Sequence, residues 1–220
     1  MGKYASKIVA IAKAWRGVKQ GDNVHKYIVD LYNSHKPLAR GYTLKYSDAW
    51  CAGFVSSCAI KAGFTDIIPT EVSCPKMITL FQNMGCWIEN ENRIPNVGEI
   101  VFYDWDDNGV GDNKGSSDHV GIVVNVSRET FTVIEGNYSN MVKERIIKIN
   151  DKFIRGFGVP KYDKEVSNPS ETVSKPSEAV PNCVTEFAKM VIRGDFGNGE
   201  ARKENIINTI QDEVNRLLKG

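Results

Sequence analysis

Residues 118–137 have the sequence DHVGIVVNVSRETFTVIEGN, in which two β-strand patterns flank a short polar turn. Apolar and polar residues alternate over 119–126 and again over 130–135, and β-branched residues are enriched in both segments. This alternation is typical of strands that bury one face against a core. The stretch therefore predicts two consecutive antiparallel strands.

The same alternation predicts further strands at 99–105, 143–150 and 153–160. Before them, helical spacing of apolar residues predicts helices over 3–16 and 24–32. A third helix is expected to begin after a cap at Ser47-Asp48 and to end at Gly63, and a fourth to run from Pro75 to Gly85. Helices followed by an antiparallel meander indicate an α+β fold with the helices packed on the sheet.

The composition is that of an ordinary globular protein. The 220 residues are 41% hydrophobic and 25% charged, with a formal net charge of +1. A general nucleic-acid binder would carry a basic excess, so we expect no nucleic-acid partner. No run approaches the roughly 18 apolar residues of a spanning helix, so we expect no membrane insertion. The apolar run after Lys3 and Lys7 is too short for a signal peptide.

The C-terminal quarter differs from the rest of the chain. Residues 163–182 contain three prolines and four serines but no aromatic residue, which is the composition of a linker. Residues 183–220 hold two helical patterns around a glycine-rich turn at 194–199. We therefore expect a domain large enough to hold an active site over 1–162, a linker over 163–182 and a small helical module over 183–220.

The five cysteines are spaced irregularly, and the chain has no CxxC pair and only three histidines. Neither a zinc cluster nor a disulfide scaffold is expected, so most of these thiols should be reduced core residues. Cys51 differs because it falls in the first turn of the predicted third helix. Unpaired N–H groups at a helix start stabilise a thiolate. The alternative is that Cys51 is also a buried core residue.

Three further residues have types that fit a cysteine nucleophile. His119 begins a predicted strand, and Glu135 and Asn137 end the next one with side chains on the same face, where either could accept the second imidazole N–H. Taken singly, these are an ordinary strand-end histidine and solvated polar residues. Taken together with Cys51, they match the nucleophile, base and orienting residue of thiol hydrolases.

These residues lie in segments that resemble a known family. Residues 49–55 (AWCAGFV), 118–123 (DHVGIV) and 135–137 (EGN) resemble the three signature blocks of the CHAP family, the cysteine, histidine-dependent amidohydrolases/peptidases that cut peptidoglycan stem peptides. The resemblance implies a papain-like α+β fold over about 5–162. It also implies Cys51 as nucleophile, His119 as base, Glu135 and Asn137 as orienting residues, and no cofactor for the chemistry.

The resemblance leaves the cleaved bond open. An N-acetylmuramoyl-L-alanine amidase is the first expectation, and a peptidoglycan endopeptidase would use the same site. A non-catalytic cell-wall-binding protein is a third alternative, although it would not need the complete set of four site residues.

The tail resembles a second family. Residues 187–202 and 210–215 are similar to the CW-seven-type cell-wall-binding repeat of phage lysins, which binds the disaccharide-peptide unit of peptidoglycan. A glycine-rich turn exposes backbone N–H groups, and an arginine guanidinium can donate two parallel hydrogen bonds to a carboxylate. We therefore expect wall contacts from Asp195, Gly197, Asn198, Gly199 and Arg202. The alternative is a plain turn with a solvated arginine.

The two resemblances together imply a phage endolysin. It would be made in the host cytoplasm without a signal peptide and would act on the bacterial cell wall after release. A single small repeat should bind weakly, so we expect either a homo-oligomer formed through the tail or additional substrate contacts from the catalytic domain.

One acidic segment matches part of a calcium-binding loop. Asp104, Asp106, Asn108 and Asp112 stand at positions one, three, five and nine, with glycine at position six. Position twelve is Gly115 instead of the bidentate glutamate, so a complete EF-hand is excluded. The segment predicts either a structural Ca²⁺ site or a polar turn without metal.

Overall fold

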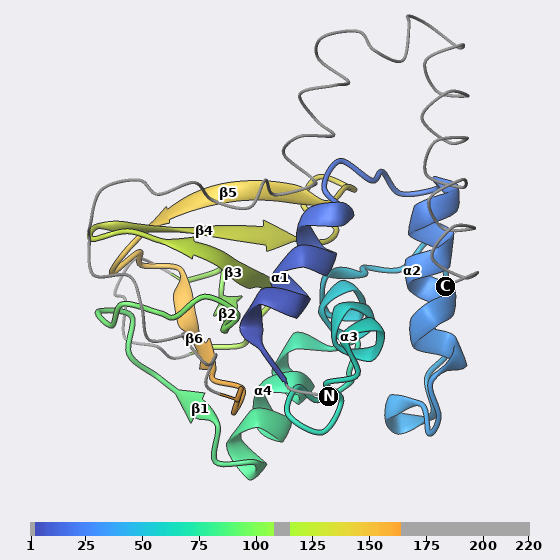
Figure 1. Cartoon of the computed structure of the whole chain (residues 1–220), viewed down its shortest axis with the longest axis horizontal. Helices are drawn as coiled ribbons and strands as arrows, with labels where there is room; N and C mark the ends of the chain where they lie inside the picture. The colour runs from blue at the N-terminus through green and yellow to red at the C-terminus, as the bar shows by residue number, and fades with distance from the viewer. Residues whose placement is uncertain (1–2, 108–114, 164–220) are drawn as a thin grey trace, which may run out of the picture. The chain divides into compact units, whose positions relative to one another are not determined.

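The structure is a computed structural model and describes residues 3–107 and 115–163, in which helices precede an antiparallel sheet (Figure 1). The elements are α1 (Ala5–Ala14), α2 (Asn23–Ser34), the short 3₁₀ helix η1 (Ala39–Gly41), α3 (Cys51–Ala62), α4 (Cys74–Asn83), β1 (Trp87–Ile88), β2 (Ile100–Tyr103), β3 (His119–Val126), β4 (Thr130–Glu135), β5 (Lys143–Lys148) and β6 (Ile154–Gly158). The predicted α+β class, with N-terminal helices packed on an antiparallel sheet, is confirmed.

The strand order in the sheet is β1-β6-β2-β3-β4-β5. Strands β2 to β5 form the predicted meander, but β6 was wrongly expected to continue it. Instead β6 pairs with β2 and β1 on the other side of the sheet. All four residues of β2 are buried, so its second edge needs a partner strand to satisfy its backbone groups.

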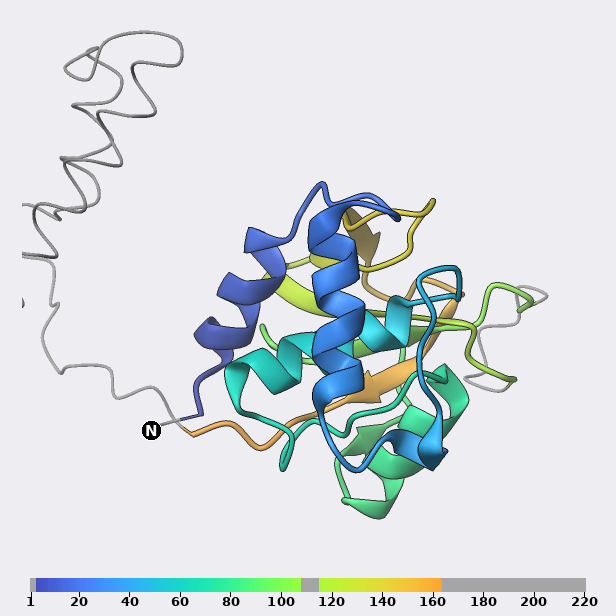
Figure 2. The same ribbon diagram turned by 90° about the vertical axis from the view of Figure 1, so that its right-hand side faces the viewer.

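The helices form layers on the sheet. Helices α1 and α3 contact β3, and α2 packs against α3 (Figures 1 and 2). Helix α3 therefore lies between α2 and the sheet, and nearly all of its residues are buried. A helix with this much apolar surface must be covered on most sides. This position holds its first residue, Cys51, rigidly against the sheet.

The predicted cap of α3 was wrong. Its N-cap residue is Trp50, and the Asp48 carboxylate instead accepts the Lys45 N–H and the Tyr42 hydroxyl, each at 2.8 Å. The carboxylate stabilises the preceding turn, so the helix begins after Trp50. Consequently Cys51 is the first helical residue.

Most other helix and strand boundaries differ from the predictions by one or two residues, and one strand was not predicted. Helix α4 begins at Cys74, one residue before Pro75, and β1 was not predicted because two residues carry no alternation pattern. No helix within residues 3–107 and 115–163 is long and apolar enough to cross a membrane. The predicted helical module at 183–220 lies outside the described residues.

Candidate active site

Cys51 lies at the N-terminus of α3 with a side chain that is only 6% exposed. Its Sγ is 3.7 Å from the Sγ of Cys74 and 4.0 Å from the Asp118 carbonyl oxygen. The Cys74 thiol and the His119 imidazole hydrogen-bond to this sulfur and, despite burial, hold the pKa of Cys51 well below the ordinary thiol value. The N–H of Ala52 acts in the same direction, as expected at a helix start.

His119 begins β3, opposite Tyr103 in the β2–β3 register. Its ring centroid is 6.1 Å from that of Tyr103, 5.8 Å from Trp105 and 6.0 Å from Tyr138. Burial lowers the pKa of His119, but the hydrogen bond to Cys51 and the charges of Cys51 and Glu135 outweigh it and raise this pKa. Opposite shifts of the two pKa values favour a thiolate–imidazolium pair.

Glu135 ends β4 and is fully buried, but its carboxylate hydrogen-bonds to Arg145 and not to the histidine. Arg145 Nε donates to Oε2 at 2.5 Å and Nη2 donates to Oε1 at 2.6 Å. The distance from Glu135 Oε1 to His119 Nε2 is 3.8 Å, which is too long for a hydrogen bond. Glu135 therefore acts on the imidazole through its charge, and the predicted direct hydrogen bond is absent.

Asn137 follows β4 in a left-handed conformation with φ 60°. Its Oδ1 is buried without a hydrogen-bond partner among the described residues, and so is Nε2 of His119. A buried polar atom without a partner costs free energy, so each favours a complementary group. The acceptor role of Asn137 toward His119 stays a prediction, and these two unpaired atoms are complementary to each other.

A glycine allows the end of β4 to approach the start of α3. A Cβ on Gly136 would lie 2.4 Å from the Cβ of Phe54 and 3.1 Å from Cε3 of Trp50. Any larger residue would push the strand away from the helix. This contact explains how residues far apart in sequence, Cys51 and Glu135, come into one site.

Arg145 was not predicted from the sequence. Its guanidinium carbon is 5.2, 4.9 and 4.5 Å from the ring centroids of Tyr103, Trp105 and Tyr138. In β5 it looked like one of several solvated charges on an alternating strand. Its register partner is Val133, which makes it the diagonal neighbour of Glu135 on the same face. Only the strand register reveals this contact.

The pH profile follows from the two shifted pKa values. We expect the rate of Cys51 alkylation by iodoacetamide, and any hydrolysis that depends on this thiolate, to stay high below the ordinary thiol pKa. The rate of hydrolysis should fall as pH drops through the lowered pKa of Cys51, and fall again as pH rises through the raised pKa of His119. An alkylation rate that rises only near the ordinary thiol pKa would contradict the ion pair.

The predicted calcium loop is only partly described. Asn108 and Asp112 lie outside the described residues. Asp104 Oδ1 accepts the Asp106 N–H at 3.1 Å, as in an ordinary polar turn. Within residues 3–107 and 115–163, no group of three His, Cys, Asp or Glu residues is placed to hold a metal ion. Calcium binding therefore stays a prediction that needs its own test.

If the loop binds Ca²⁺, EDTA should lower the melting temperature and added calcium should restore it, because a ligand of the folded state stabilises that state. Asp106→Ala should abolish this response. Melting curves that are equal in EDTA and in millimolar calcium would identify the loop as a polar turn.

A cavity of about 340 Å³ lies beside the start of α3. It is lined by Arg40, Tyr42, Leu44, Asp48, Ala49 and Val72. Ala49 lies two residues before Cys51 in the chain, so the cavity borders the segment that leads into α3. The lining combines apolar side chains with charges of both signs, which suits a peptide ligand.

The comparisons with known proteins agree with the sequence resemblances. Residues 41–137 match the CHAP domain, and residues 185–218 match the CW_7 repeat. No curated protein matches the chain. The five predicted wall-binding residues lie within the matched repeat but outside the described residues.

Two solved structures are similar to this chain. The crystal structure of Ly7917 with the hydrolyzing product of MDP is 15% identical, with a TM-score of 0.42 over 71% of this chain and 63% of that chain. The crystal structure of Ly7917 is 15% identical, with a TM-score of 0.36 over 71% and 62%. The chain thus spans less than two thirds of the length of these proteins.

Proposed function

Because the chain contains a CHAP domain followed by a CW_7 repeat, we propose that it is a peptidoglycan hydrolase that cleaves an amide bond by a cysteine–histidine mechanism. The observation that carries this proposal is the placement of Cys51 at the start of α3 beside His119 at the start of β3, an arrangement that lowers the pKa of the thiol and raises that of the imidazole. Such a pair at a helix start generates a nucleophile near neutral pH.

In the proposed mechanism the Cys51 thiolate attacks an amide carbonyl carbon, and the His119 imidazolium protonates the leaving nitrogen. Water activated by the neutral imidazole then hydrolyses the thioester. His119 Nε2 faces Glu135, which leaves Nδ1 for Cys51. The buried Glu135 carboxylate stabilises the imidazolium through its charge, and Arg145 holds that carboxylate in place through two hydrogen bonds.

The backbone at the start of α3 contributes to transition-state stabilisation. The first N–H groups of a helix have no partner within it, so the Cys51 N–H can donate to the developing oxyanion. The peptide segment of the substrate would occupy the cavity lined by Arg40 and Asp48.

We propose the N-acetylmuramoyl-L-alanine bond as the scissile amide. The support is the CW_7 repeat, since a repeat of this family that holds the disaccharide-peptide unit would keep the enzyme near the junction of sugar and peptide. Cleavage within the stem peptide requires the same residues and is the second candidate. A non-catalytic wall-binding role would not need Cys51 at a helix start together with His119 and the buried Glu135 beside it.

The same domain pair supports a phage endolysin that reaches the wall from the host cytoplasm. Its partner would be peptidoglycan, with avidity from a homo-oligomer or from contacts of the catalytic domain itself. The direct test is incubation of the reduced full-length protein with purified peptidoglycan. Release of soluble fragments supports hydrolysis, and intact peptidoglycan at all protein concentrations would contradict it.

The wall-binding role of the repeat gives a separate prediction. Arg202→Ala should reduce co-sedimentation of the full chain with purified cell walls, with an effect that weakens as salt rises, because a charge-assisted contact is screened. Arg128→Ala, on the turn between β3 and β4, is the matched control and should sediment like the unaltered chain. Equal sedimentation of all three proteins would show that Arg202 does not contact the wall.

A further inference from the structure

A second thiol lies against the proposed nucleophile. Cys74 is the first residue of α4, and its Sγ is 3.7 Å from that of Cys51. The two residues are 5% and 6% exposed, so the sulfurs are shielded from large molecules. A disulfide needs the sulfurs at about 2.05 Å, so the two side chains must rotate toward each other to form one.

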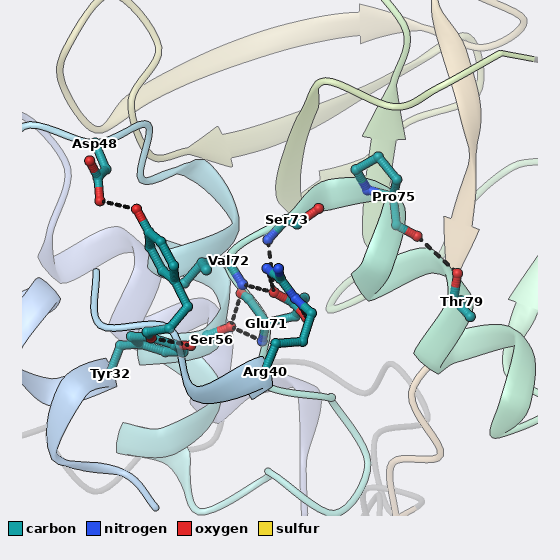
Figure 3. A network of polar contacts seen from close by, with 10 residues as sticks. Tyr32, Arg40, Asp48, Ser56, Glu71, Val72, Ser73, Pro75 and Thr79 are labelled. Carbon is teal, nitrogen blue, oxygen red and sulfur yellow. Dashed lines mark hydrogen bonds and ion pairs between the residues drawn. The ribbon is translucent and has the colours of Figure 1, made fainter. Parts of the chain in front are cut away.

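The segment that leads into α4 is held by a polar network around the buried Glu71 (Figure 3). Arg40 donates to both carboxylate oxygens, at 3.0 and 2.8 Å, and the carboxylate also accepts the Val72 N–H at 2.7 Å. The Ser56 hydroxyl of α3 bonds to the Glu71 carbonyl oxygen at 2.7 Å and to its N–H at 2.9 Å. The network therefore ties the start of α4 to α3 and keeps the two thiols together.

The two thiols differ in their ionisation. The hydrogen bond from Cys74 is the largest cause of the lowered pKa of Cys51, and the same contact, with burial, raises the pKa of Cys74. These opposite shifts favour Cys51 as the thiolate and Cys74 as the protonated partner across the 3.7 Å contact. This is the asymmetry of a reactive thiol beside a resolving thiol, since oxidants attack the thiolate.

The other described cysteines have different surroundings. Cys58 is fully buried and its pKa is raised by burial alone, and the Cys86 thiol donates to the Met84 carbonyl oxygen at 3.3 Å. Burial disfavours a thiolate at Cys58, and neither cysteine lies against a second thiol as Cys51 does, so both serve as internal references.

We propose that Cys51 and Cys74 form a redox-active pair, in which a hydroperoxide oxidises Cys51 and Cys74 then closes a reversible disulfide. The Cys51 thiolate attacks one oxygen of hydrogen peroxide, and the O–O bond breaks. Hydroxide departs, and Cys51 is left as a sulfenic acid. The Cys74 sulfur then attacks the Cys51 sulfur, and the S–O bond breaks. The departing hydroxide takes the Cys74 proton and leaves as water.

Two electrons pass from the two sulfurs to the peroxide, and a dithiol reductant returns them. The disulfide blocks the nucleophile and also protects it from irreversible oxidation to sulfinic acid. The consequence for hydrolysis rests on the proposed function, but formation of the disulfide does not.

The test uses the reduced full-length protein treated with excess hydrogen peroxide. Remaining thiols are then alkylated, and peptides are mapped by mass spectrometry without reduction. We expect a Cys51–Cys74 linked peptide that dithiothreitol removes, with recovery of the Cys51 alkylation rate. Cys86→Ala should give the same linked peptide.

In Cys74→Ser, Cys51 should instead gain two oxygen atoms and should not recover with dithiothreitol. Two results would overturn the pair: a Cys51 that gains two or three oxygen atoms in the unaltered protein without a Cys74 link, or equal recovery of Cys74→Ser and the unaltered protein. The linked peptide in a protein that releases no peptidoglycan fragments would refute only the proposed function. Fragment release without the linked peptide would refute only the redox pair.

Discussion

Cys51→Ala is expected to abolish fragment release from peptidoglycan while the protein stays folded. Loss of a covalent nucleophile lowers kcat by about 10⁴-fold or more in comparable hydrolases, because positioning and oxyanion stabilisation alone remain. The substitution removes one sulfur atom at the start of α3, so the fold and sedimentation with cell walls should be retained. The measurement is the rate of dye release from labelled peptidoglycan at several enzyme concentrations.

Cys86→Ala is the matched control, since this residue is also 6% exposed but its thiol donates to the Met84 carbonyl oxygen, outside the contacts of Cys51. It should keep a substantial part of the activity. Undiminished fragment release by Cys51→Ala would assign the nucleophile to another residue.

Arg145→Met is expected to give the largest loss of stability, about 3–5 kcal/mol in the free energy of unfolding, because it leaves a buried carboxylate without its counter-ion. Glu135 is fully buried, and Arg145 provides two of its hydrogen bonds. Urea denaturation followed by circular dichroism measures this loss. Adding Glu135→Gln to Arg145→Met should recover much of it, since the uncompensated charge is then gone.

Arg16→Met gives the matched comparison. Arg16 pairs with Glu144, also on β5, but the two side chains are 57% and 37% exposed. Removing an exposed pair costs about 0–1 kcal/mol. Equal stability losses for Arg16→Met and Arg145→Met would show that burial does not increase the loss of stability when the partner of Glu135 is removed.

The strands at the centre of the fold were predictable from local pattern. Strands β3 and β4 begin and end at the predicted residues because both have apolar alternation bounded by polar turns. The position of β6 was not predictable, because alternation says that a segment is a strand but not which edge it joins. The start of α3 was also missed, since a good capping residue, Asp48, stabilises the preceding turn instead.

The site shows the same limits. Positions at the start of a helix and at the start of a strand indicated Cys51 and His119, because a residue's place in an element follows from pattern. The contacts of Glu135 with Arg145 and of Cys51 with Cys74 depend on strand register and helix packing. Such contacts join residues that look like a surface arginine and a core cysteine in the sequence.

The most direct test of the proposed activity is mass spectrometry of the fragments that the purified, reduced protein releases from peptidoglycan. The account predicts soluble products with one new free amine and one new carboxylate per cleaved amide, absent with Cys51→Ala. A free lactyl carboxylate on muramic acid would identify the amidase, and a new terminus within the stem peptide the endopeptidase. Intact amide bonds alongside cleaved glycosidic bonds, or products unchanged by Cys51→Ala, would contradict the thiol mechanism.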